Sequence, residues 1–134
     1  MSIIVTDRGF RPSEAVNSVT LADLSQHQGS VDLAHTDDPA LLEGQLDQIT
    51  LIRISFPAFS DGRAFTIARR LRMMGYTGEL RATGPVIADQ YAMARRVGFD
   101  SVEIPEELAQ RQPEEQWIFR ANWKAHDYQS RLRA

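Results

Sequence analysis

The fold is decided by residues 48–104, which read QITLIRISFPAFSDGRAFTIARRLRMMGYTGELRATGPVIADQYAMARRVGFDSVEI. Runs at 49–54, 79–83 and 101–104 predict three strands, the first apolar enough to be buried on both faces. Between them, apolar positions at helical spacing predict helices, which Gly75 and Gly98 end. Strands that alternate with helices are typical of a parallel sheet with crossover connections.

The flanking residues extend this pattern in both directions. Short strands are predicted at 3–6, 19–22 and 31–35, with a turn at 7–9. A helix is expected to begin at Pro39 and to run through Leu46, and a C-terminal helix begins at Pro113. We therefore expect a single α/β domain over residues 1–134, with a mostly parallel sheet. The pattern leaves open whether the sheet is an open three-layer sheet or half-barrel-like.

Composition excludes several classes of protein. The chain has 134 residues, no cysteine and three scattered histidines, so we expect no metal site and no redox cofactor. No window is long and apolar enough to span a membrane, and the N-terminus does not resemble a signal peptide. We expect a cytoplasmic protein. A net charge of −3 argues against a nucleic-acid partner.

Charge is unevenly distributed along the chain. Residues 51–100 carry eight arginines against four acids, a net charge of +4, while the first 50 residues carry −6 and the last 34 carry −1. Arginine outnumbers lysine 14 to 1, and its planar head suits contacts with oxyanions. The basic middle of the chain therefore contains the candidate ligand site.

Polar residues of this middle segment follow the ends of predicted parallel strands, where ligands usually bind. We expect a small-anion site there, formed by Asp61, Arg63, Arg81, Asp89 and Gln90. Structural roles are the alternative. Asp61 would then cap the helix and neutralise Arg63, Arg81 would pair with Asp61 or Asp89 inside the sheet, and Gln90 would cap a carbonyl group.

The predicted C-terminal helix has aromatic residues on more than one side. Trp117 and Tyr128 lie on one apolar stripe, and Phe119 and Trp123 lie on another. The second stripe predicts an interface, and a homodimer is our first expectation for it. The alternative is that the segment bends at Asn122 and packs both stripes into one core.

Many residues of the middle segment follow a long, ordered pattern: Phe56-Pro57, Phe59, Asp61-Gly62-Arg63, Ala68-Arg69, Leu71-Arg72, Gly75-Tyr76, Gly78-Glu79-Leu80-Arg81-Ala82, Gly84, Val86, Asp89-Gln90, Arg95-Arg96 and Gly98-Phe99-Asp100. This pattern resembles a bacterial family of unknown function whose genes commonly lie beside those for sulfite reductase. Members are described as oxidoreductases or accessory proteins of sulfite reduction. The resemblance covers residues 48–104 closely, with Ala64 where many relatives are expected to have glycine.

The resemblance implies a role in sulfur assimilation and cysteine biosynthesis, and two interpretations stay open. In the first interpretation, the protein is a non-catalytic accessory protein. It contacts sulfite reductase or a related enzyme, or it delivers a small anion. Alternatively, it is a small enzyme with an arginine-lined pocket for an oxyanion or a phosphorylated metabolite. The family provides no catalytic residues that can be carried over to this chain.

Overall fold

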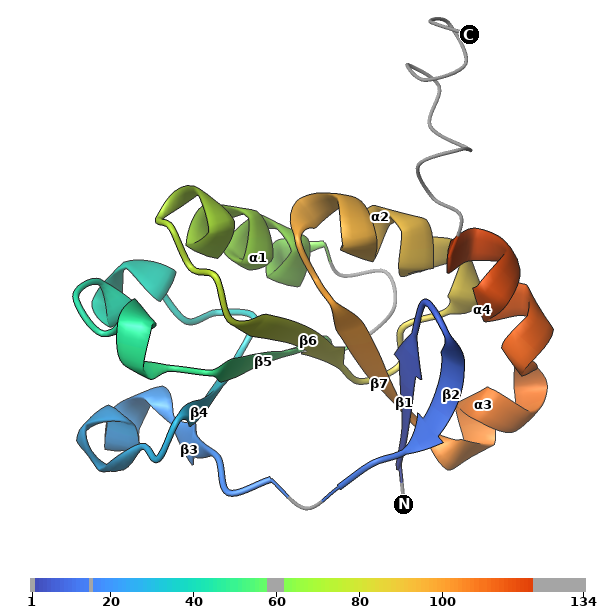
Figure 1. Cartoon of the computed structure of the whole chain (residues 1–134), viewed down its shortest axis with the longest axis horizontal. Helices are drawn as coiled ribbons and strands as arrows, with labels where there is room; N and C mark the ends of the chain where they lie inside the picture. Colours follow the sequence, from blue (N-terminus) through green and yellow to red (C-terminus); the bar gives the residue numbers. More distant parts are fainter. Residues whose placement is uncertain (1, 15, 58–61, 122–134) are drawn as a thin grey trace, which may run out of the picture.

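A computed structural model describes residues 2–14, 16–57 and 62–121. Within them, seven strands form one sheet in the order β2-β1-β7-β6-β5-β4-β3 (Figure 1). The strands are β1 (Ser2–Thr6), β2 (Gly9–Pro12), β3 (Val19–Thr20), β4 (Ser30–Leu33), β5 (Leu51–Ser55), β6 (Glu79–Thr83) and β7 (Ser101–Pro105). The α-helices are α1 (Arg63–Met73), α2 (Tyr91–Val97), α3 (Glu106–Arg111) and α4 (Glu114–Ala121). Short 3-10 helices are η1 (Leu21–Gln26), η2 (Pro39–Leu42), η3 (Leu46–Gln48) and η4 (Ala88–Gln90).

The sheet is mostly parallel, as the sequence predicts. Strands β3 to β7 are parallel and follow one another in chain order, whereas β1 is antiparallel to both β7 and β2. Each crossover advances to the next strand in the same direction, so successive helices fall on the same face. Figure 1 shows α1 and α2 together over one face of the sheet. This agrees with the half-barrel-like alternative rather than with the three-layer one.

One hydrophobic core lies between this sheet face and the helices. Alternate residues of the central strands enter it, among them Ile52, Ile54, Leu80 and Ala82. Helix α1 contributes its apolar stripe, and α4 contributes Trp117, which is fully buried. The other face of each strand points away from this core, because successive side chains alternate.

The second sheet face is polar, and the chain crosses it. Between β2 and β3 the chain runs on the side of the sheet away from α1 and α2 (Figure 1). Arg81 and Ser101 belong to this second face and are only 5% and 1% exposed. Ile4 is also buried but lies outside the main core cluster. The sheet therefore has a charged, partly enclosed side.

Some local predictions were wrong. The turn predicted at 7–9 is present at residues 7–8, but residues 9–12 form a strand that was not predicted, β2, paired with β1. The helix expected to run from Pro39 through Leu46 is replaced by η2 and η3, with Gly44 between them at a positive φ of 87°.

No helix among the described residues is long and apolar enough to cross a membrane.

Candidate functional site

The polar sheet face carries a row of side chains set by strand register. Asp32 pairs with Arg53 across β4 and β5, Arg53 with Arg81 across β5 and β6, and Arg81 with Ser101 across β6 and β7. Because paired residues share a sheet face, these four side chains lie in one line across four strands. The row is a charged cluster that three different β-α-β units build together.

Arg53 is held on one side by a carboxylate. Its Nε and Nη2 donate to the two oxygens of Asp32 at 2.7 and 2.8 Å. This bidentate hydrogen bonding raises the pKa of Arg53, against the opposing effect of burial. On the other side, Nη1 of Arg53 lies 3.7 Å from Oε1 of Glu103, beyond hydrogen-bond distance.

Arg81 is paired in the same cluster. Its Nε donates to the Ser101 hydroxyl at 3.1 Å, and its Nη2 donates to Glu79 at 2.8 Å. Its Nη1 lies 3.6 Å from the same Glu103 oxygen that faces Arg53. The other oxygen of Glu103 accepts a hydrogen bond from Ser2 at 2.7 Å. Glu103 therefore stands between two guanidinium groups. One of its oxygens accepts from Ser2, and within residues 2–14, 16–57 and 62–121 no donor lies at hydrogen-bond distance from the other.

A cavity of about 290 Å³ opens beside this cluster. It lies at the carboxyl ends of parallel strands, the edge where ligands usually bind in α/β sheets. Its lining combines two carboxylates, one guanidinium group, two hydroxyls and a small apolar wall: Asp32, Leu33, Ala34, Arg53, Ser55, Thr83 and Glu103. The lining is charged with both signs, so the cavity suits a small polar molecule better than an apolar one.

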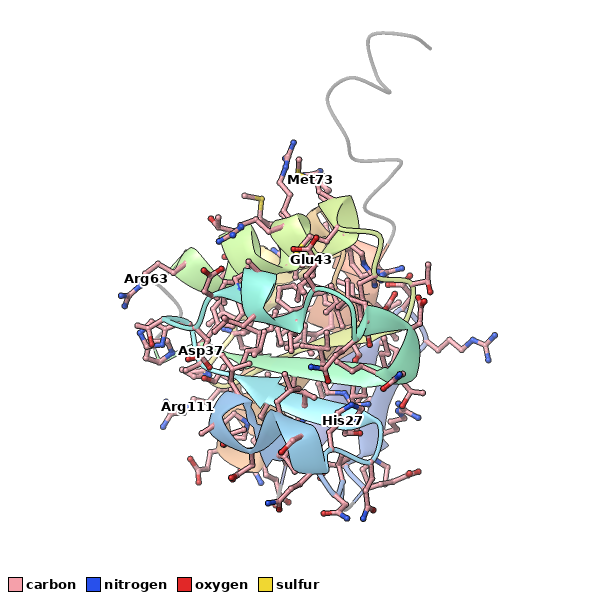
Figure 2. The ribbon with its side chains drawn as sticks, turned by 90° about the vertical axis from the view of Figure 1, so that its left-hand side faces the viewer. His27, Asp37, Glu43, Arg63, Met73 and Arg111 are labelled. Carbon is pink, nitrogen blue, oxygen red and sulfur yellow. The ribbon has the colours of Figure 1, made fainter. Side chains whose placement is uncertain are left out.

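The structure separates the residues predicted to form an anion site. Arg81 lies in the middle of β6 on the polar face, whereas Arg63 begins α1 on the other side of the sheet. Figure 2 shows Arg63 directed away from the body of the protein. Asp89 is exposed and pairs with Arg120 at 2.6 Å. Gln90 accepts a hydrogen bond from the Ile87 amide at 3.1 Å, and Asp61 lies outside the described residues.

The expected partners of Arg81 need correction. We expected Asp61 or Asp89, but Asp89 pairs with Arg120 instead. Glu79 and Glu103 pair with Arg81. Glu79 is two residues away on the same strand face, and Glu103 belongs to the adjacent strand β7. Both partners lie within the sheet beside Arg81, whereas Asp89 lies in η4.

Sequence reasoning missed the lining residues of the cavity. Arg53 interrupts a run that we interpreted as a strand buried on both faces, and Glu103 interrupts another predicted strand. Asp32, Arg53 and Glu103 each occupy the position in a strand that alternates with core residues. A charged residue at that position in three strands of one sheet is the signal that indicates a polar sheet face.

A second polar cluster joins the ends of α1 and α2 to the sheet. Arg72 donates to the carbonyl oxygens of Tyr76, Gly78 and Gly98 and to Asp100, at 2.7–3.0 Å. Asp100 also accepts a hydrogen bond from the Leu80 amide at 3.0 Å. This cluster fixes both helix ends against β6 and the start of β7.

The C-terminal aromatic residues fall into two groups. Trp117 is buried, as predicted, and its indole donates to the Gln112 carbonyl at 3.0 Å. Phe119 is 62% exposed, on a different side of α4. Trp123 and Tyr128 lie outside the described residues, so the second stripe stays a prediction. In the part of the chain that the structure describes, no group of histidine and acidic residues could hold a metal ion.

Comparison with known proteins gives one match. No curated protein and no solved structure matches the chain. A family model described as bacterial protein of unknown function (DUF934) matches residues 30–134, which includes all of the pattern on which the resemblance rests. The chain therefore belongs to the bacterial DUF934 family.

Proposed function

We propose that this protein is a non-catalytic accessory protein of assimilatory sulfite reduction that acts by contact with a reductase or a related enzyme. The link to sulfite reduction rests on the residue pattern that resembles the family encoded beside sulfite reductase genes. The positions of the described residues of that pattern favour contact over catalysis. None of them lines the cavity on the polar sheet face.

Pattern residues serve two other purposes in the fold. Arg72, Gly78, Gly98 and Asp100 fasten the helix ends to the sheet. Others are exposed on the helical layer, where they include Arg63, Arg69 and Arg96. Helices α1 and α2 contain six arginines and no acidic residue. Three of the six, Arg70, Arg72 and Arg95, pair with acidic residues of neighbouring segments, and the other three are exposed and make this layer basic. A basic protein surface favours an acidic partner, because complementary charge steers association and selects the partner.

Delivery of a small anion through Arg81 has less support. Arg53 and Arg81 share the polar face with Asp32, Glu79 and Glu103, so three carboxylates face two guanidinium groups. An oxyanion would meet a net negative cluster. The same charge balance weakens the alternative of a small enzyme that holds an oxyanion or a phosphorylated metabolite in an arginine-lined pocket.

Self-association through Phe119 and Trp123 is a further part of the proposal. Its support is the exposure of Phe119 on α4. Full burial of a large aromatic side chain is worth about 1.5–3 kcal/mol, so a second copy of the chain that covers the exposed part of Phe119 gains a fraction of this.

Co-purification tests the contact. The tagged protein is isolated from the source bacterium grown on sulfate, and its partners are identified by mass spectrometry. We expect subunits of sulfite reductase, and we expect the double variant Arg69→Glu, Arg96→Glu to recover much less of them. The matched control, Arg111→Glu, reverses an exposed arginine on α3 and should recover as much as wild type. Absence of the reductase from the wild-type preparation would contradict the proposal.

A further inference from the structure

The cavity on the polar sheet face is lined by an ion pair whose facing atoms lie beyond hydrogen-bond distance. Nη1 of Arg53 and Oε1 of Glu103 face each other at 3.7 Å, too far for a hydrogen bond. The same Glu103 oxygen lies 3.6 Å from Nη1 of Arg81. No atom fits between groups at this distance, but a polar atom that lies to one side of the pair, in the cavity, can contact both of them. The pair supplies a donor and an acceptor at the same place.

Charge balance narrows the ligand class. The lining has one guanidinium group and two carboxylates, and the wider cluster has two against three. An anion alone would be repelled by the carboxylates, and a cation alone would leave the free donors of Arg53 without an acceptor. A molecule that carries both charges on neighbouring atoms satisfies both groups.

Size and the remaining lining agree with a small molecule of that kind. A volume of about 290 Å³ is at the lower end for ligand pockets. The hydroxyls of Ser55 and Thr83 are register partners at the ends of β5 and β6, and both line the cavity. Ala34 provides a small apolar contact for a short side chain, while the Leu33 side chain belongs to the core on the other sheet face.

We propose that this cavity binds a free α-amino acid with a small side chain, its carboxylate at Arg53 and its ammonium group at Glu103. The hydroxyl of Ser55 supplies a further hydrogen bond to the carboxylate, whereas that of Thr83 donates to the Ile54 carbonyl oxygen. This inference does not depend on the sulfite-reduction proposal, because it rests on the polar sheet face and not on the helical layer.

Calorimetric titration of the full chain tests it with glycine, L-alanine and L-serine. Two probes related to L-alanine each lack one charge: alaninamide lacks the carboxylate, and lactate lacks the ammonium group. Sodium sulfite tests a simple anion. We expect at least one of the amino acids to bind, and the single-charge probes and sulfite to bind at least about tenfold more weakly. Failure of all three amino acids at about 10 mM would overturn the proposal, as would equal or tighter binding of lactate, alaninamide or sulfite.

Variants locate the binding. Arg53→Met removes the guanidinium group, and we expect it to weaken amino-acid binding by at least about tenfold. Ser55→Val leaves every ion pair in place but narrows the cavity at an exposed position, so it reports on the site even if Arg53→Met does not fold. Arg69→Met, on the exposed side of α1, is the control and should bind like wild type. Unchanged affinity in Ser55→Val and in any folded Arg53→Met would place the binding elsewhere and overturn the assignment.

Discussion

Replacing Arg72 by methionine should destabilise the protein more than any other change to an arginine of α1. The guanidinium group makes five hydrogen bonds, four to backbone carbonyl oxygens and one to Asp100. Each hydrogen bond from a charged group contributes about 1.5–3 kcal/mol, but contributions within one network are not additive. The Arg72 side chain is 26% exposed, so water can reach some of the acceptor oxygens that lose their donor in the variant. We expect a loss of about 3–5 kcal/mol in the free energy of unfolding.

Urea unfolding followed by circular dichroism measures this loss, and a thermal melt should show a fall of about 10–15 °C. Arg69→Met is the matched control, because Arg69 is exposed on the same helix and its loss should change stability by no more than about 0.5 kcal/mol. Arg72→Lys keeps the charge but not the fork of donors, and it should recover only a small part of the loss. A loss below about 1 kcal/mol in Arg72→Met would refute the role assigned to this cluster.

Four other predictions test separate features. Gly84→Ala should cost more stability than Gly75→Ala, although both glycines have positive φ, because a Cβ at 84 would press on the Phe56 carbonyl oxygen while 75 faces open space; equal losses in urea unfolding would contradict this. Burial raises the pKa of Tyr76, and burial and a hydrogen bond to Asp7 raise that of Tyr91, so above pH ~10 the unfolded chain loses protons that the native protein keeps. Stability should therefore be unaffected by these groups below that pH and fall above it, with a shallower fall in Tyr91→Phe; a flat profile in wild type would count against it. The absorption spectrum of the purified protein should show protein bands only, and a stoichiometric flavin or haem band would revive the oxidoreductase interpretation. Sedimentation equilibrium should show a wild-type dimer that Trp123→Ser converts to monomer, and a wild-type monomer at micromolar concentration would remove the basis for the interface.

The sequence predicts the strands of the sheet better than it predicts the polar contacts. Strand β6 begins and ends at the predicted residues, and Gly98 ends α2 with a positive φ of 116°, as a helix-stopping glycine should. Strand β2 escaped prediction because Gly9–Pro12 contains a proline and an arginine and has little alternation. Its pairing with β1 comes from the hairpin, of which the sequence predicted the turn at 7–9 but not the second strand.

The candidate site was less predictable for a different reason. The partners of Arg81 depend on register between β6 and β7, which fixes Thr83 opposite Glu103 and Arg81 opposite Ser101. A single sequence does not reveal that register. The apolar residues around Arg53 concealed the direction of its side chain. In this segment, a strand that is buried on both faces and a strand that has one polar face differ by only one side chain.

The contact with sulfite reductase is the central claim, and sedimentation velocity of the purified protein mixed with the purified reductase holoenzyme tests it most directly. We predict that part of the small protein moves with the reductase boundary, and that Arg69→Glu, Arg96→Glu abolishes this while Arg111→Glu does not. Electrostatic steering also predicts that the association weakens as salt is raised. Two independent boundaries at low salt, with both proteins at about 10 μM, would contradict the account.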